Sequence, residues 1–292
     1  MMRTALHLLL GLAVVGPAHA LQVTDDRGVT VTFAQTPQRI VSLLPSLTES
    51  VCAMEQCQRL VGVDRYSNYP ASVKALPVLG GGLDPNIEGI VALKPDVVLV
   101  AASSRASSRL ESLGLKVVAL ETKTHADVRR VLQTLGVLLD VPDESGAGRL
   151  WHVIDASVSA AAQSLPAKAR NARVFFEVNR GPYAAGESSF IGETLSRLGV
   201  KNVVPAELGP FPLLNPEFVV RANPDVIMVG NSSMQAMATY PGWTSIKVVR
   251  EQRICAFSAQ ESDVLVRPGP RMAEAARIMA SCLERHAPRP SP

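Results

Sequence analysis

One fifteen-residue pattern occurs twice in this chain and constrains the fold more than any other feature. Residues 86–100 read NIEGIVALKPDVVLV and residues 215–229 read NPEFVVRANPDVIMV, so the two copies align without gaps. Each copy opens on an asparagine suited to cap a helix, and its proline ends the helical stretch because the preceding residue avoids the α region. A continuous apolar run follows, as is typical of a parallel strand buried on both faces. The sequence therefore predicts one helix–strand unit in each half of the chain.

The alternation of helices and strands extends beyond this repeat. Apolar segments predict further strands at residues 39–43, 60–63, 116–120, 172–178 and 253–257. Apolar residues at helical spacing predict helices at 126–139 and 191–198. Because such alternation builds parallel sheets covered by helices, we expect an α/β protein with two Rossmann-like lobes. The opening VTDDRGVTVTF predicts a hairpin ahead of the first lobe.

The chain divides into four predicted segments. Residues 1–20 resemble a secretory signal peptide whose apolar run is too short for a membrane span, so we expect a soluble, exported protein. Residues 21–140 and 168–292 are the predicted N-terminal and C-terminal α/β lobes. Residues 141–167 are predicted to hold one long, rigid helix that joins them, with apolar residues at helical spacing. A ligand cleft is expected between the lobes, where the carboxyl ends of the parallel strands face each other.

Composition and charge argue against several classes of function. The formal net charge of +3, without a basic stripe that carries aromatic residues, argues against a nucleic-acid partner. After the predicted signal peptide only three scattered histidines remain, which suits neither a metal site nor a Ser-His-Asp set. The sequence also lacks the common nucleotide-binding and hydrolase motifs. We therefore predict no enzyme, no catalytic residue, no metal ligand and no resident cofactor.

Four cysteines are candidates for disulfide bonds, because an exported chain meets an oxidising compartment. Pairing Cys52 with Cys57 and Cys255 with Cys282 would keep each bridge within one half of the chain. The other two connectivities would tie the halves together, and the sequence leaves all three open. The spacing of Cys52 and Cys57 also resembles that of metal ligands, but no histidine lies nearby in the sequence.

Several motifs in order resemble the periplasmic substrate-binding proteins of ABC importers. They are RIVSLLPSLTESVCA, LVGVDRYSNYPASV, LPVLGGGLDPNIEGIVALKPDVVLV and SDVLVRPGPRMAEAARIMA, which together extend over nearly all of the mature chain. The most similar subgroup has a helical backbone between its lobes and serves cobalamin, haem and ferric siderophores. The resemblance is strongest to cobalamin-binding proteins. It implies a monomer in the periplasm that captures a metal chelate and delivers it to a transmembrane permease.

The resemblance also gives a reason for the repeated glutamate. In this family each lobe presents one exposed glutamate to the permease, and the matching positions are Glu88 and Glu217. A two-fold symmetric permease needs such a pseudo-symmetric partner. The alternative is that both glutamates only stabilise helix N-termini, where the helix dipole favours negative charge.

Five residues match positions that face the ligand in this family. They are Tyr66 in the first lobe and Tyr183, Phe211, Asp263 and Arg267 in the second. Aromatic faces supply contact area for a large, flat ligand, and a few polar groups fix its orientation. The resemblance thus implies a corrinoid as the ligand.

Two departures from the family pattern keep other ligands open. Glycine and alanine stand at 80–82 and 101–102, where cobalamin binders carry aromatic residues, so the cleft is expected to be roomier. Arg180 is a further candidate ligand contact, and an anionic ferric siderophore or haem would suit a cleft lined by arginines. Arg65, Arg105 and Arg271 could add to that charge. An enzyme that processes the ligand and a sensor that reports it to a membrane partner are further alternatives.

Overall fold

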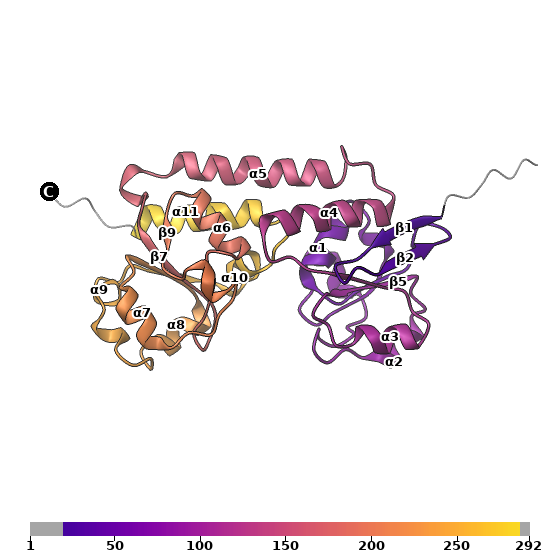
Figure 1. Ribbon diagram of the computed structural model, residues 1–292, viewed down its shortest axis with the longest axis horizontal. Coiled ribbons are helices and arrows are strands. Elements are labelled where there is room, and N and C mark those ends of the chain that lie inside the picture. The colour runs from indigo at the N-terminus through magenta and orange to yellow at the C-terminus, as the bar shows by residue number, and fades with distance from the viewer. Residues whose placement is uncertain (1–19, 287–292) are drawn as a thin grey trace, which may run out of the picture.

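Each half of the chain forms its own sheet covered by helices in the computed structural model, which describes residues 20–286 (Figure 1). The two lobes lie side by side, and a long helix runs across the top of both in this view. The predicted α/β class with two lobes is confirmed. The predicted signal peptide lies almost entirely outside the described residues.

The first lobe is built on a four-stranded parallel sheet in the order β4-β3-β5-β6. Its strands are β3 (Ile40–Ser42), β4 (Leu60–Val63), β5 (Val97–Ala101) and β6 (Val117–Leu120). Its helices are α1 (Pro45–Ala53), α2 (Ile87–Ala92), α3 (Ser107–Ser112) and α4 (His125–Leu139). The predicted hairpin precedes them as antiparallel β1 (Leu21–Thr24) and β2 (Thr30–Phe33). It joins the lobe where the amide of Asp26 donates to the carbonyl of Ala119, 3.0 Å away.

The second lobe has the strand order β11-β10-β7-β8, with β9 also paired to β7. Its strands are β7 (Arg173–Asn179), β8 (Tyr183–Ala184), β9 (Lys201–Asn202), β10 (Val226–Gly230) and β11 (Ile254–Phe257). Its helices are α6 (Phe190–Arg197), α7 (Pro216–Ala222), α8 (Asn231–Met237), α9 (Lys247–Arg250), α10 (Ala259–Val266) and α11 (Met272–His286). β8 is antiparallel to β7, and the other pairings in this sheet are parallel.

The sequence repeat forms the same unit in both lobes, as predicted. The side chains of Asn86 and Asn215 cap α2 and α7 by accepting from the amides of Gly89 and Glu217, each at 2.9 Å. The strands that follow, β5 and β10, each have a neighbour on both sides. The first four residues of each strand are apolar and buried, which explains why both runs lack polar residues.

The connecting helix is α5 (Ala147–Ser164), which occupies only part of the predicted segment 141–167. Residues 142–146 form a turn instead, in which the amide of Gly146 donates to the carbonyl of Pro142 at 2.8 Å. Gly146 itself has a non-helical conformation, with φ −108° and ψ −111°, so the helix can start only after it. α5 packs on α4 of the first lobe and on α11 of the second.

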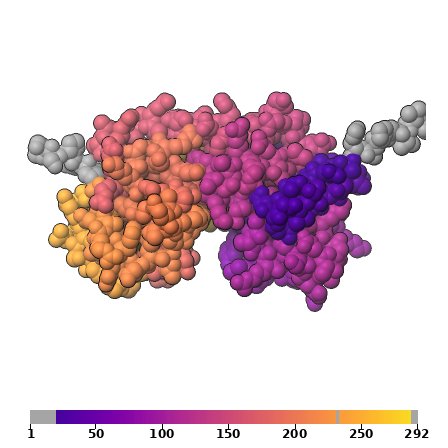
Figure 2. Space-filling model, viewed as in Figure 1, coloured from indigo at the N-terminus to yellow at the C-terminus, as the bar shows by residue number. Residues whose placement is uncertain are grey.

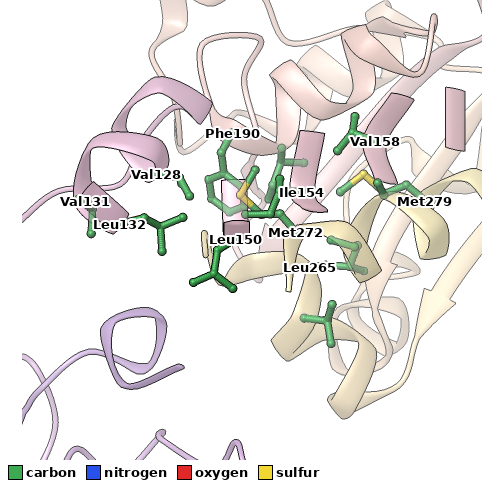
Figure 3. Close-up of a cluster of buried hydrophobic side chains, with 14 of the residues drawn as sticks. Val128, Val131, Leu132, Leu150, Ile154, Val158, Phe190, Leu265, Met272 and Met279 are labelled. Atoms are coloured by element: carbon green, nitrogen blue, oxygen red, sulfur yellow. The ribbon is translucent and has the colours of Figure 1, made fainter. Parts of the chain in front are cut away.

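One hydrophobic core continues from the first lobe into the second beneath α5. Figure 3 shows side chains of α4, α5, α6 and α11 gathered at this junction, among them Leu132, Ile154, Phe190 and Met272. Smaller clusters lie on the opposite faces of the two sheets. Because the core is shared, a change in the angle between the lobes would have to repack buried side chains.

Each of the two disulfide bonds joins cysteines of the same half of the chain, one bond in each half. Cys52 at the end of α1 is bonded to Cys57, and Cys255 in β11 is bonded to Cys282 in α11. Trp243 is fully buried and donates to the carbonyl of Pro216 at 3.0 Å, as expected of a packing residue. Within residues 20–286, no helix is both long enough and apolar enough to cross a bilayer.

Candidate functional site: the hollow between the lobes

Figure 2 shows a hollow in the protein surface where the two lobes face each other, on the side away from α5. Two cavities lie along this junction. One of about 710 Å³ is lined by Asn68, Tyr69 and Lys74 from the first lobe and by residues of α10 and α11 from the second. Its lining includes Asp263, one of the predicted ligand contacts. The segments that line this cavity follow the carboxyl ends of β4 and β11, as expected for a ligand site in an open α/β fold.

The second cavity, of about 750 Å³, lies between α4 and α6 and is lined by no predicted ligand residue. His125 is buried there, and its Nε2 lies 3.1 Å from the carbonyl of Phe190 and 2.9 Å from the Thr194 hydroxyl. Burial is the main cause that lowers the pKa of His125, so the ring is neutral at physiological pH. These contacts join the lobes, and we place the ligand site elsewhere.

A turn after β4 presents Tyr66 to the solvent. The buried Asp64 accepts from the amide of Tyr66 at 2.8 Å and from the hydroxyl of Ser67 at 2.5 Å. Ser67 is in turn bonded to the hydroxyl of Thr48 in α1, 2.9 Å away. Burial raises the pKa of Asp64, although these hydrogen bonds oppose the rise. The turn is fixed from below while the ring of Tyr66 remains 61% exposed.

Beside Tyr66 the first lobe carries a recess of about 190 Å³. It is lined by Tyr66, by Gly81 to Asp84 and by Ala101, among others. Gly81, Gly82 and Ala101 are among the small residues for which the sequence predicts a roomier cleft. Leu83 at its rim is almost fully exposed, and Arg65 pairs with Asp84 at 2.5 Å.

Aromatic side chains are also exposed at the carboxyl end of β7 in the second lobe. Tyr183 on β8 is 41% exposed and forms an isolated bridge to Leu213, which brings the 210–214 segment alongside it. Phe211 in that segment is 37% exposed and packs on Phe190, with ring centroids 6.0 Å apart. Arg180 lies exposed in the loop that leads into β8. The structure thus groups Tyr183, Phe211 and Arg180 at one edge of the lobe.

Arg267 connects the Tyr66 turn with the second lobe. Its guanidinium group donates to the carbonyl of Tyr66 at 3.0 Å and to the Asn68 side chain at 2.8 Å. It also pairs with Asp263 and with Glu49, each at 2.9 Å. Arg267 is only 7% exposed, so it lies beneath the surface and does not present a free charge to the hollow. Asp263 is partly exposed and accepts from Asn68 of the opposite lobe at 2.8 Å.

Glu49 on α1 is the centre of this network between the lobes. Its buried carboxylate accepts from Arg271 at 2.8 and 2.6 Å as well as from Arg267. The guanidinium of Arg271 also lies over the ring of Tyr69, 4.4 Å from its centroid. Two arginines therefore face two carboxylates, and the site gains little net positive charge from them.

Two functional candidates, Glu49 and Glu177, are absent from the residues that the sequence predicts. Glu49 stands in SLTES, on the first helix of the lobe, where a charge between the polar residues Thr48 and Ser50 gives a weak signal. Glu177 stands inside the apolar strand RVFFEVN, where a lone carboxylate is unusual and could have been noticed. Their partners come from distant parts of the chain, so sequence spacing does not indicate what either residue does.

The repeated glutamates are exposed on the first turns of α2 and α7. Both helices lie on the side of their lobes away from α5 (Figure 1). Glu217 is 3.5 Å from Arg221 on the same helix, a solvent-exposed pair. Within the described part of the chain, no group of three or more histidine, cysteine, aspartate or glutamate residues is arranged to hold a metal ion.

Comparison with known proteins gives one consistent family. The sequence model described as periplasmic binding protein matches residues 40–260. A substrate-binding lipoprotein of an ABC transporter from Bacillus subtilis is 27% identical, with 89% of this chain and 84% of that one covered. A vitamin B12-binding protein from Pectobacterium atrosepticum is 27% identical over 85% of this chain and 88% of its own. A solved structure of a possible iron-binding, periplasmic solute-binding protein from Staphylococcus epidermidis has 25% identity and a TM-score of 0.71, covering 85% and 99%.

Proposed function

The chain belongs to the periplasmic binding protein family, and we propose that it captures a corrinoid and delivers it to the permease of an ABC importer. The observation that carries this proposal is the exposure of aromatic rings on both lobes. Tyr66 on the first lobe and Tyr183 and Phe211 on the second offer flat apolar faces. A corrin ring is large and flat, so it can lie against such faces from both sides.

The balance of charge favours a corrinoid over a strongly anionic chelate. Arg267 and Arg271 are paired with Glu49 and Asp263, and Arg65 is paired with Asp84. Arg105 and Arg180 remain exposed, and Lys74 lines the cavity of about 710 Å³. A corrinoid carries many amide side chains and little net charge, so the polar groups of Asn68 and Asp263 suit it. In this proposal Arg267 positions the Tyr66 turn and Asp263.

A ferric siderophore or haem is the second candidate ligand. The similarity to the possible iron-binding protein from Staphylococcus epidermidis supports it. The recess of about 190 Å³ beside Tyr66 also leaves space for a bulkier group than a planar ring. The exposed Arg180 would then pair with a carboxylate or phenolate of the chelate.

Delivery is proposed to use Glu88 and Glu217 as the contacts with the permease. Each is exposed on a short helix of the repeated unit, so the two lobes offer equivalent groups to a two-fold symmetric partner. We propose that the protein acts as a periplasmic monomer and that residues 1–20 direct its export. Residues 21–140 then form the N-terminal lobe, residues 141–167 carry the connecting helix, and residues 168–292 form the C-terminal lobe. ATP hydrolysis would take place on other subunits of the importer.

The test is equilibrium titration of the protein, beginning at Leu21, with cyanocobalamin, cobinamide, haemin and a set of ferric siderophores. Calorimetry reports the number of sites and the affinity for each. Tight corrinoid binding at one site supports the proposal, whereas binding of an iron chelate alone would replace it by the second candidate. Release of a chemically altered ligand would point to the enzyme alternative.

A further inference from the structure

The recess of about 190 Å³ in the first lobe lies where the order of the parallel strands reverses. β3 is the first strand of this sheet, and the chain continues to β4 on one side of it and then to β5 on the other. The connecting helices α1 and α2 accordingly pack on opposite faces of the sheet. Such a reversal opens a crevice outside the carboxyl ends of the strands, where ligands of open α/β folds bind. Leu43 after β3 and Ala101 at the end of β5 line the recess, so it occupies this crevice.

Apolar residues form most of the lining, and two of them are exposed at the rim. Tyr66 is 61% exposed and Leu83 is 98% exposed. A ligand group that covers these side chains removes apolar surface from water, which favours binding. Asp84 is the one charged residue of the lining within the described part of the chain, and it is paired with Arg65 at 2.5 Å. An ionised ligand group would lose its hydration there without gaining an unpaired opposite charge, so the recess suits a neutral group.

The size of the recess limits what it can hold. A closed apolar cavity of about 150 Å³ holds one benzene molecule. The recess therefore fits one aromatic ring or a compact pair of fused rings, and it is too small for a corrin or porphyrin macrocycle. Gly82 keeps this space open, because a Cβ atom built there would have the carbonyl oxygen of Leu43, 3.7 Å away, as its nearest contact outside the adjacent residues. A larger side chain at position 82 would thus occupy the recess without a clash at its Cβ.

We propose that the recess is a subsite for a neutral, flat aromatic group that the ligand carries on an arm, and that in a corrinoid this group is the benzimidazole base. The identity of the ligand rests on the proposed function, whereas the fit of an aromatic ring to the recess does not. In a complete corrinoid the base hangs below one face of the macrocycle. With that face turned toward the first lobe, the base enters the recess beside Tyr66, and Tyr183 and Phe211 of the second lobe contact the opposite face. The recess then makes the protein selective for complete corrinoids over cobinamide, which lacks the base.

The first experiment compares the dissociation constants of cyanocobalamin and cobinamide by calorimetry. We expect the unaltered protein to bind cyanocobalamin about tenfold to a hundredfold more tightly, the range for one well-packed ring. Gly82→Phe places a phenyl group in the recess and should remove this preference by weakening cyanocobalamin alone. Gly82→Ala adds one methyl group and should keep most of the preference. Ala156→Phe adds a phenyl group at an exposed position of α5 and serves as the control, expected to bind both corrinoids as the unaltered protein does.

Two results with the corrinoids would overturn the inference. One is equal affinity of the unaltered protein for cyanocobalamin and cobinamide. The other is an equal loss of affinity for both in Gly82→Phe, because the phenyl group would then obstruct the macrocycle and not the base. If Gly82→Phe does not show a cooperative thermal unfolding transition, Ala101→Leu takes its place with the same expectations, since Ala101 lines the recess from β5.

A second experiment decides the role of the recess if cyanocobalamin does not bind, a result with which the proposed function fails. The probes are dimethylbenzimidazole and catechol alone, followed by saturation-transfer NMR, because the ring of a catecholate siderophore has the same flat shape as the corrinoid base. Saturation transfer to either probe that is kept in Gly82→Ala and lost in Gly82→Phe supports the subsite, and the stronger signal identifies the source of the aromatic group. No signal with the unaltered protein, or an equal signal with Gly82→Phe, would overturn the inference.

Discussion

Replacing Glu49 by glutamine tests how the lobes are held together. The side chain keeps its size but loses its charge, so Arg267 and Arg271 are left with one carboxylate, that of Asp263, between them. Breaking a buried ion pair by removing one partner costs about 3–5 kcal/mol. We expect the upper part of that range to be reached, because Glu49 receives three hydrogen bonds from the two arginines.

Equilibrium unfolding in urea measures this loss. With an m-value of about 3 kcal/mol/M, the midpoint should fall by about 1–2 M. The control is Glu144→Gln, an exposed glutamate in the turn before α5, for which we expect a shift within about 0.5 kcal/mol. A loss below about 1 kcal/mol for Glu49→Gln would mean that solvent screens the network, and the reasoning from burial would then be refuted.

Three further predictions concern pH, the longer disulfide and docking. The raised pKa of Glu177 means that the native state keeps this proton up to a higher pH than the unfolded chain does, so stability should fall between about pH 4.5 and pH 7 and then level off. Glu177→Gln should remove about 3 kcal/mol of this dependence in thermal unfolding at several pH values. Replacing Cys255 and Cys282 by serine opens a loop of 27 residues and should lower the free energy of unfolding by about 2–4 kcal/mol; no change in denaturant midpoint would contradict this. Changing Glu88 and Glu217 together to alanine should abolish uptake by the reconstituted importer and leave the calorimetric affinity for the ligand unchanged, and a large loss of affinity would instead assign them to the ligand site.

Local sequence signals predict the elements of this fold because the forces that form them are local. The Asn86 and Asn215 caps, the prolines of the repeat and the apolar runs act within a few residues, and the structure has α2-β5 and α7-β10 where they indicate. The position at which α5 begins within residues 141–167 was not predicted, because the turn at 142–146 depends on Gly146, whose conformation the apolar spacing does not report. The strands β8 and β9 also had no signal in the sequence. Each is only two residues long and is defined by its pairing with β7.

The site could be predicted only in part, for a different physical reason. Exposed aromatic residues such as Tyr66 can be matched to a family pattern one position at a time. The network of Glu49 with Arg267 and Arg271 joins residues more than 200 positions apart in the chain, so no spacing indicates it. For the same reason the sequence does not show that the charge of Arg267, a predicted ligand contact, is balanced by two carboxylates.

A double-mutant cycle on Tyr66 and Tyr183, read out by titration with cyanocobalamin, tests most directly the claim that one ligand lies between the two lobes. Each change to alanine should weaken binding by about tenfold to a hundredfold. The two losses should not add, because both rings contact the same ligand from opposite lobes. Unchanged affinity in either single variant, with the protein folded, would contradict the proposed site.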